Sequence, residues 1–106
     1  MGKNSIIKSL GKVIGNLAVH KATLKFGDKP ESEHHTSSEI VSYRNNGKYL
    51  GSGYNWNKED KKLIRNQAFK YFFKKMKKKY SHINFTINDA NNIIDKSMNE
   101  CIFIND

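Results

Sequence analysis

The sequence predicts a mainly α-helical fold in which three or four helices pack as a small bundle or an open array. Two observations lead to this prediction. Apolar residues recur at helical spacing in three separate stretches, residues 4–24, 57–80 and 90–102. The rest of the chain offers no convincing sheet, which a lone hairpin would need as a partner. Because the chain of 106 residues is long enough for one core, we expect a single domain over residues 1–106.

Residues 4–24 are predicted to form an amphipathic helix with a basic polar side. The polar side holds Lys8, Ser9, Lys12 and Asn16. Gly11 and Gly15 lie one turn apart, which favours close packing by another helix. The sequence does not fix where this helix ends, since the apolar residues from 22 to 26 alternate as they would in an extended segment. An alternative use of the stretch is as a basic amphipathic segment that lies on an anionic membrane.

Residues 27–36 are predicted to be a loop, because glycine, aspartate and the only proline fall within four residues. His34 and His35 lie in this loop. Their spacing from the other two histidines and from Cys101 matches no pattern of zinc ligands. No metal site is therefore expected.

Residues 37–56 are ambiguous between a helix and a hairpin. Thr36 and Glu39 have the spacing of a capping box, which favours a helix. Asn46 and Gly47 form a strong hairpin-turn signal, which gives an α+β fold as the alternative. The stretch is also dense in aromatic residues, namely Tyr43, Tyr49, Tyr54 and Trp56. We favour core packing for these side chains over base stacking of the kind that single-strand binders use.

Residues 57–80 are predicted to form the longest helix, with Asn57 as its N-cap. Acidic residues follow the cap, and three lysines crowd the last turn, as the helix dipole favours. One broad arc of this helix is apolar. The opposite side holds Gln67, Lys70, Lys74, Lys77 and Lys78.

The end of the chain is predicted to be an extended connector followed by a final helix. Thr86 and Asp89 form a capping box at the start of that helix. Its outer face is acidic, so its carboxylates are expected to pair with the basic helices. The predicted core combines residues from all three helical stretches: Leu10, Ile14, Leu17, Ile64, Phe69, Phe72, Phe73, Met76, Ile94 and Met98.

Positive charge dominates the composition and is unevenly placed. The chain holds 19 Lys and Arg against 10 Asp and Glu, for a net charge of +9. Residues 57–79 carry ten basic and two acidic groups, and residues 1–26 carry five lysines and no acid. Such a surface attracts polyanions through counterion release. Because only two of the 19 basic residues are arginine, base-specific readout is not expected.

The sequence contains no local signature of catalysis. It lacks a phosphate-binding glycine loop, a dinucleotide fingerprint and a nucleophile elbow, so we expect a protein that is not an enzyme and uses no cofactor. The single cysteine, Cys101, excludes an intrachain disulfide and is expected to be a buried hydrophobe in the reducing cytoplasm. No apolar run approaches the roughly 18 residues of a membrane span, so no integral membrane association is expected.

These observations predict a small basic protein that binds nucleic acid, either RNA or DNA, or a ribonucleoprotein, with little sequence specificity. The residues expected to contact phosphates are Lys70, Lys74, Lys77 and Lys78, with Lys8 and Lys12 as a second patch. One alternative is a protein-interaction module, such as a small regulator or inhibitor, that binds an acidic partner. A second is a peripheral binder of anionic membrane, and a third is that the lysines form only a solvated face.

Overall fold

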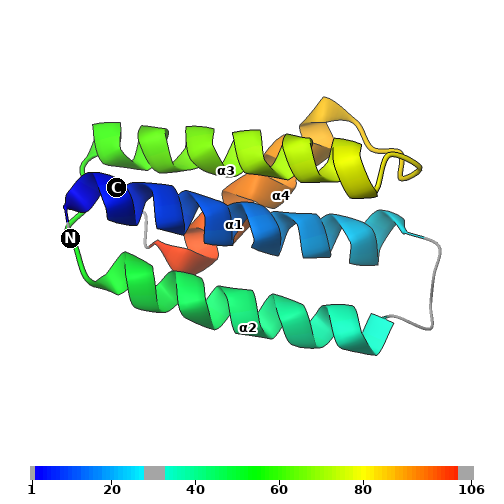
Figure 1. The fold of residues 1–106 in the computed structure, drawn as a ribbon, viewed down its shortest axis with the longest axis horizontal. Helices are drawn as coiled ribbons and strands as arrows, with labels where there is room; N and C mark the ends of the chain where they lie inside the picture. Colours follow the sequence, from blue (N-terminus) through cyan, green and yellow to red (C-terminus); the bar gives the residue numbers. More distant parts are fainter. Residues whose placement is uncertain (1, 28–32, 103–106) are drawn as a thin grey trace.

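The computed structural model describes residues 2–27 and 33–102. Within these ranges the chain forms four helices and no strand: α1 (Lys3–Phe26), α2 (Glu33–Ser52), α3 (Lys58–Lys79) and α4 (Ile87–Cys101). In Figure 1, α1 lies between α2 and α3, and α4 crosses obliquely behind them. Helices α1 and α3 run in the same direction, and α2 runs in the opposite one. The predicted mainly α-helical class, a small bundle or array, is confirmed.

Helix α2 settles the ambiguous stretch in favour of a helix, because it continues without a break through Asn46 and Gly47. The hairpin alternative is therefore wrong. The predicted capping box is wrong as well, since α2 begins at Glu33 and Thr36 lies inside its first turns. Residues 33–36 of the predicted loop are thus helical, Gly27 is the C-cap of α1, and residues 28–32 lie outside the described residues.

Glycines mark close approaches between helices. A Cβ atom on Gly47 would collide with Cys101 Sγ of α4, and one on Gly11 would collide with Gln67 Cβ of α3. A Cβ atom on Gly15 would lie only 3.0 Å from Tyr71 Cβ. The predicted role of Gly11 and Gly15 in close packing is confirmed. At Gly47 the same residue type is needed for packing rather than for a turn.

Helices α3 and α4 begin at the predicted caps. The Asn57 side chain accepts a hydrogen bond of 2.8 Å from the Asp60 backbone N–H, and Asp60 accepts one of 3.2 Å in return. The Thr86 hydroxyl accepts from the Asp89 N–H at 3.1 Å, and Asp89 accepts from Thr86 at 3.0 Å. Each capping box satisfies backbone donors that the first turn leaves without a helical partner.

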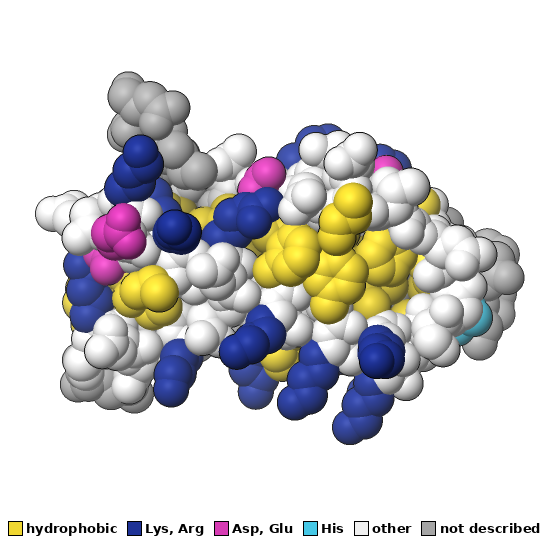
Figure 2. Space-filling view, turned by 90° about the horizontal axis from the view of Figure 1, so that it is seen from above, with side chains coloured by type: hydrophobic (Ala, Val, Ile, Leu, Met, Phe, Trp, Pro, Cys, Tyr) yellow, Lys and Arg dark blue, Asp and Glu magenta, His cyan; other side chains and the backbone are white. Residues whose placement is uncertain are grey.

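One continuous hydrophobic cluster joins the four helices. Of the ten predicted core residues, all but Phe69 and Phe73 are buried in it. These two side chains are only partly buried and pack at its edge, where their ring centroids lie 4.7 Å apart. They stay at the edge because α4 crosses obliquely instead of running alongside α3. Figure 2 shows an apolar patch on this face of the molecule, with lysine and arginine side chains near it.

Candidate functional site

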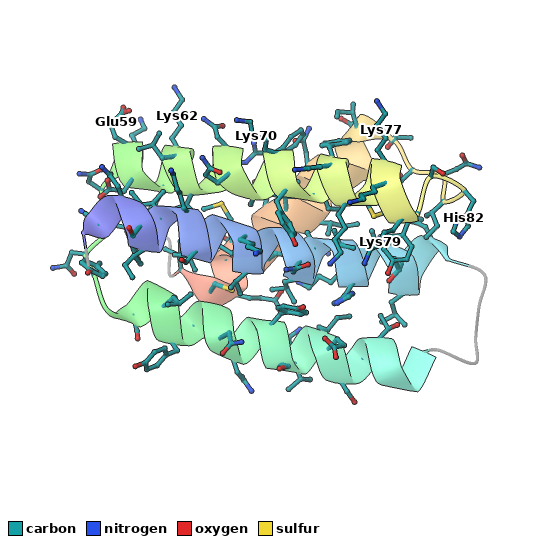
Figure 3. All side chains as sticks on the ribbon, viewed as in Figure 1. Glu59, Lys62, Lys70, Lys77, Lys79 and His82 are labelled. Atoms are coloured by element: carbon teal, nitrogen blue, oxygen red, sulfur yellow. The ribbon has the colours of Figure 1, made fainter. Side chains whose placement is uncertain are left out.

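The lysine face of α3 is the first part of the candidate site. Its four predicted residues, Lys70, Lys74, Lys77 and Lys78, are all exposed. Figure 3 shows Lys62, Lys70 and Lys77 pointing away from the other helices. None of the four predicted lysines forms a salt bridge with an acidic side chain of the described residues. Their charge is therefore available to a polyanion.

Acidic side chains near α3 are held by other cations. Asp60 Oδ2 lies 2.6 Å from Lys3 Nζ, and Asp95 Oδ1 of α4 lies 2.8 Å from Arg65 Nε. Glu59 is exposed in the first turn of α3, about 16 Å along the axis from the first lysine of the predicted face. The predicted pairing of acids on the final helix with the basic helices is confirmed for Asp95.

A second acid of α4, Glu100, bridges two partly exposed cations, Lys21 of α1 and Arg44 of α2. Glu100 Oε2 lies 2.7 Å from Arg44 Nε, and Lys21 Nζ donates to Glu100 Oε1. Burial, followed by the positive charge of Arg44, lowers the pKa of Lys21 to about 8. This cluster links three helices and lies away from the lysine face of α3. We therefore assign it a structural role.

The lysine patch of α1 meets that of α3 around one aromatic ring. Lys8 and Lys12 are exposed, as predicted. Lys12 Nζ of α1 lies 5.9 Å from the centroid of the Tyr71 ring, and Lys75 Nζ of α3 lies 5.8 Å from the same centroid. Lys74 and Lys78 follow Tyr71 by three and seven residues and so lie beside it, at the border between the apolar arc and the lysine side of α3. The structure thus brings one edge of the α3 patch next to the α1 patch, while Lys70 and Lys77 point away from α1.

We define the α1–α3 basic surface as these seven residues: Lys8, Lys12, Lys70, Lys74, Lys75, Lys77 and Lys78. Sequence reasoning missed Lys75 and misplaced its partner, Asn16. Asn16 was expected on the solvent side of α1, but it is only 6% exposed and accepts a hydrogen bond of 2.9 Å from Lys75 Nζ. Helix α3 covers it, because the glycines of α1 let α3 approach closely. The helical period could have indicated that Lys75 lies near the neighbouring helix, because it places this residue at the edge of the apolar arc, between Tyr71 and Met76.

The aromatic residues of 43–56 divide between the interior and the surface. Tyr43 and Trp56 are half-buried and pack against the core, as predicted. Tyr49 is 79% exposed and Tyr54 is 38% exposed, so the prediction of core packing is wrong for these two. Tyr49 lies on the solvent side of α2, and Tyr54 follows the end of that helix, where no neighbouring element covers its ring completely.

The histidines and the cysteine of the described residues do not gather into a metal-binding group. Cys101 is buried, as predicted, and burial raises the pKa of its thiol to about 11. His20 packs against Tyr43 with ring centroids 5.1 Å apart, whereas His82 is exposed. The side chains of His34 and His35 lie outside the described residues. Among the described side chains, those of residues 2–27 and 36–102, no three His, Cys, Asp or Glu come together as metal ligands would.

Comparison with protein-family models, with curated proteins and with solved structures finds no match for this chain. In the described part of the chain, no helix combines the length and the apolar character needed to cross a bilayer.

Proposed function

We propose that this protein is a non-enzymatic, cytoplasmic binder of RNA, DNA or a ribonucleoprotein. Its α1–α3 basic surface contacts phosphates and reads little or no base sequence. The observation that carries the proposal is the meeting of Lys12 and Lys75, from two adjacent helices, around Tyr71. Among the described residues, no acid pairs with the lysines of either patch, so binding a polyanion requires no ion pair to break first.

Lysine suits this kind of contact. Its ammonium group acts as a point charge on a flexible chain, so it binds phosphate without imposing the geometry that base recognition requires. The affinity then comes mainly from counterions that the nucleic acid releases, and it falls steeply with salt. The free, buried Cys101 supports the cytoplasmic part of the proposal, because a reduced thiol is the ordinary state of cysteine there.

The test is a quadruple variant in which Lys70, Lys74, Lys77 and Lys78 are changed to Gln. The variant should fold, because exposed charges contribute little to stability. Because it can no longer neutralise up to four phosphates, the slope of log affinity against log salt should become shallower by roughly 3 to 4 on duplex DNA, and by somewhat less on single strands. Affinity should fall alike for unrelated sequences. An unchanged slope in the folded variant would show that the face is only solvated.

One observation favours a second candidate, a protein-interaction module that binds an acidic partner. Phe69, Phe73 and Phe85 form a partly exposed aromatic cluster, with the centroids of Phe73 and Phe85 6.1 Å apart. Phosphates make no use of such a cluster, whereas an acidic protein with apolar residues would. Capture from native lysate with and without nuclease separates the two candidates, because nuclease removes only partners held through nucleic acid.

The fold weakens the membrane alternative in the form that the sequence suggested. Leu10, Ile14 and Leu17 of the apolar face of α1 are fully buried in the core. That face cannot lie on a membrane while the helices stay packed.

A further inference from the structure

A cavity of about 540 Å³ opens at the end of the molecule where α2 gives way to α3, beside the last turn of α4. Its walls combine aromatic, polar and cationic groups. The residues that matter here are Lys48, Ser52, Tyr54, Asn55, Trp56 and Lys61. No acidic side chain of the described residues lines it. The volume lies in the range of cavities that hold small organic ligands.

Trp56 forms a fixed wall of this cavity. Its indole Nε1–H donates a hydrogen bond of 2.7 Å to the Gly51 carbonyl oxygen, which closes the end of α2. Lys3 Nζ lies 5.7 Å from the centroid of the Trp56 ring, and the ion pair with Asp60 holds that lysine in place. The indole is therefore restrained from two sides before any ligand enters.

Tyr54 supplies the more accessible ring. Its centroid lies 5.3 Å from that of Trp56, with the ring planes tilted by 41°, and 38% of the residue is exposed. A planar group that enters the cavity can thus contact the Tyr54 ring without displacing a core side chain. Ser52 and Asn55 add polar groups at the wall.

The charges at the wall specify what such a planar ligand should carry. Lys48 comes from α2 and Lys61 from α3, and neither forms a salt bridge with an acid of the described residues. Cys101 also borders the cavity, and because burial raises the pKa of its thiol to about 11, the residue stays neutral near pH 7 and adds no opposing charge. Two ammonium groups around an aromatic pair suit a ligand that is planar at one end and anionic at the other.

We infer that this cavity receives an unstacked base of a single-stranded nucleic acid, which packs on Tyr54 while the neighbouring phosphates contact Lys48 and Lys61. This inference rests on the proposed function and narrows it to single strands, because a base paired within a duplex is not available to the cavity. Lys61 lies on the same helix as five residues of the α1–α3 basic surface, but about half a turn from Lys70 around the axis of α3. A strand that leaves the cavity therefore has to cross α3 within the about 25 Å from Lys61 to Lys78 to reach that surface. Contact with the face of a base tolerates any sequence.

The chain contains one tryptophan, so its fluorescence reports on this cavity alone. The probes are an oligothymidylate and an abasic strand of the same length and charge. Binding is followed by the anisotropy of a label on the strand, and occupancy of the cavity is followed by Trp56 emission. Both strands should bind through their phosphates. Only oligothymidylate should quench Trp56.

The matched variants are Tyr54→Ala and Tyr49→Ala. Tyr49 is more exposed and does not line the cavity, so its removal controls for loss of a surface tyrosine. Tyr54→Ala should weaken binding of oligothymidylate by roughly 5- to 150-fold, the range found for loss of one stacked base. It should leave binding of the abasic strand unchanged. Tyr49→Ala should bind both strands as the parent protein does.

The possible failures separate the two proposals. If both strands bind equally, Trp56 emission stays constant and the two tyrosine variants behave alike, the cavity inference is wrong while the proposed function stands. If neither strand nor duplex binds at low salt, the proposed function fails, and this inference fails with it. Circular dichroism and thermal unfolding of Tyr54→Ala exclude misfolding as the cause of a loss, and the abasic strand provides a second check in the unmodified protein.

Discussion

The ammonium group of Lys75 lies 2.9 Å from Oδ1 of Asn16, so a charged side chain of α3 reaches a buried amide of α1. The bond ties together the two helices that carry the α1–α3 basic surface. It also leaves Lys75 close to the face of Tyr71 and so places one cation of the surface in a defined position. Both the stability of the fold and the geometry of the surface therefore depend on this contact.

Changing Lys75 to Met should destabilise the protein by about 1–3 kcal/mol, because Asn16 Oδ1 loses its partner while it stays buried. The free energy of unfolding from urea denaturation measures the effect. Lys74→Met is the matched control, since Lys74 is exposed and forms no salt bridge within the described residues, and its change should stay within about 0.5 kcal/mol. Equal stabilities of the two variants would contradict a structural role for the Lys75–Asn16 bond.

Gly11→Ala should be destabilising although alanine is the better helix former. The new methyl group would overlap Gln67 Cβ, so α1 and α3 must separate or distort, which costs typically about 1–3 kcal/mol. Gly53→Ala is the control. Its nearest atom would be the Leu50 carbonyl oxygen at 3.7 Å, and its φ is not positive, so the change should be neutral or slightly stabilising. Thermal unfolding measures the stability of both variants. If Gly11→Ala were more stable than the parent protein, α1 and α3 could not be packed as closely at this position as the structure shows.

The second lysine patch should take part in binding nucleic acid. A Lys8→Gln, Lys12→Gln variant is expected to make the slope of log affinity against log salt shallower by up to about 2 on duplex DNA. Lys25→Gln, Lys96→Gln removes the same net charge from exposed positions outside the α1–α3 basic surface. That control should change the slope much less. Identical slopes for the two variants would indicate that the affinity depends only on the net charge of the protein. The arrangement of lysines around Tyr71 would then have no role in binding.

The Cys101 thiol should react slowly in the folded protein at neutral pH. Burial raises its pKa from 9.0 to about 11, so the thiolate, which is the reactive form, is scarce. Iodoacetamide should modify the folded chain far more slowly than the chain in urea. Fast modification of the folded chain would show that Cys101 is more accessible than its burial indicates.

The same pKa gives a pH dependence of stability. Between about pH 9 and 11 the unfolded chain loses the thiol proton while the folded chain keeps it, so the contribution of Cys101 to stability falls as the pH rises through this range. Cys101→Ala lacks this contribution. The difference in the free energy of unfolding between parent and variant should therefore shrink by about 2 kcal/mol over the range, as measured by urea denaturation. A constant difference would contradict the raised pKa.

Local signals were sufficient to predict most of the fold. Asn57 and Thr86 act within one turn of their own position, so the sequence alone located the starts of α3 and α4. The start of α2 was mispredicted because a capping pattern at Thr36 has the same spacing inside a helix as at its end. Gly47 was ambiguous because a turn and a tight helix contact both favour glycine. Only the position of Cys101 across the interface distinguishes them.

The candidate site could be predicted only in part for a similar reason. Exposure of Lys70 or Lys12 follows from the helical period and requires no knowledge of other elements. The meeting of the two lysine patches depends on α1 and α3 lying side by side in the same direction, which no local pattern encodes. Burial of Asn16 depends on the same arrangement. Sequence reasoning therefore identified the charged residues but not the surface that they form.

The close packing of α1 against α3 at Gly11 and Gly15, here called the seam, has an electrostatic consequence. It fixes the separation between two rows of like charge, and so it sets how strongly those rows repel each other in the absence of a ligand. A bound polyanion relieves that repulsion only in the folded chain, where the rows are aligned. Ligand affinity and conformational stability are thus thermodynamically linked through the seam, and a packing change at either glycine would alter both together.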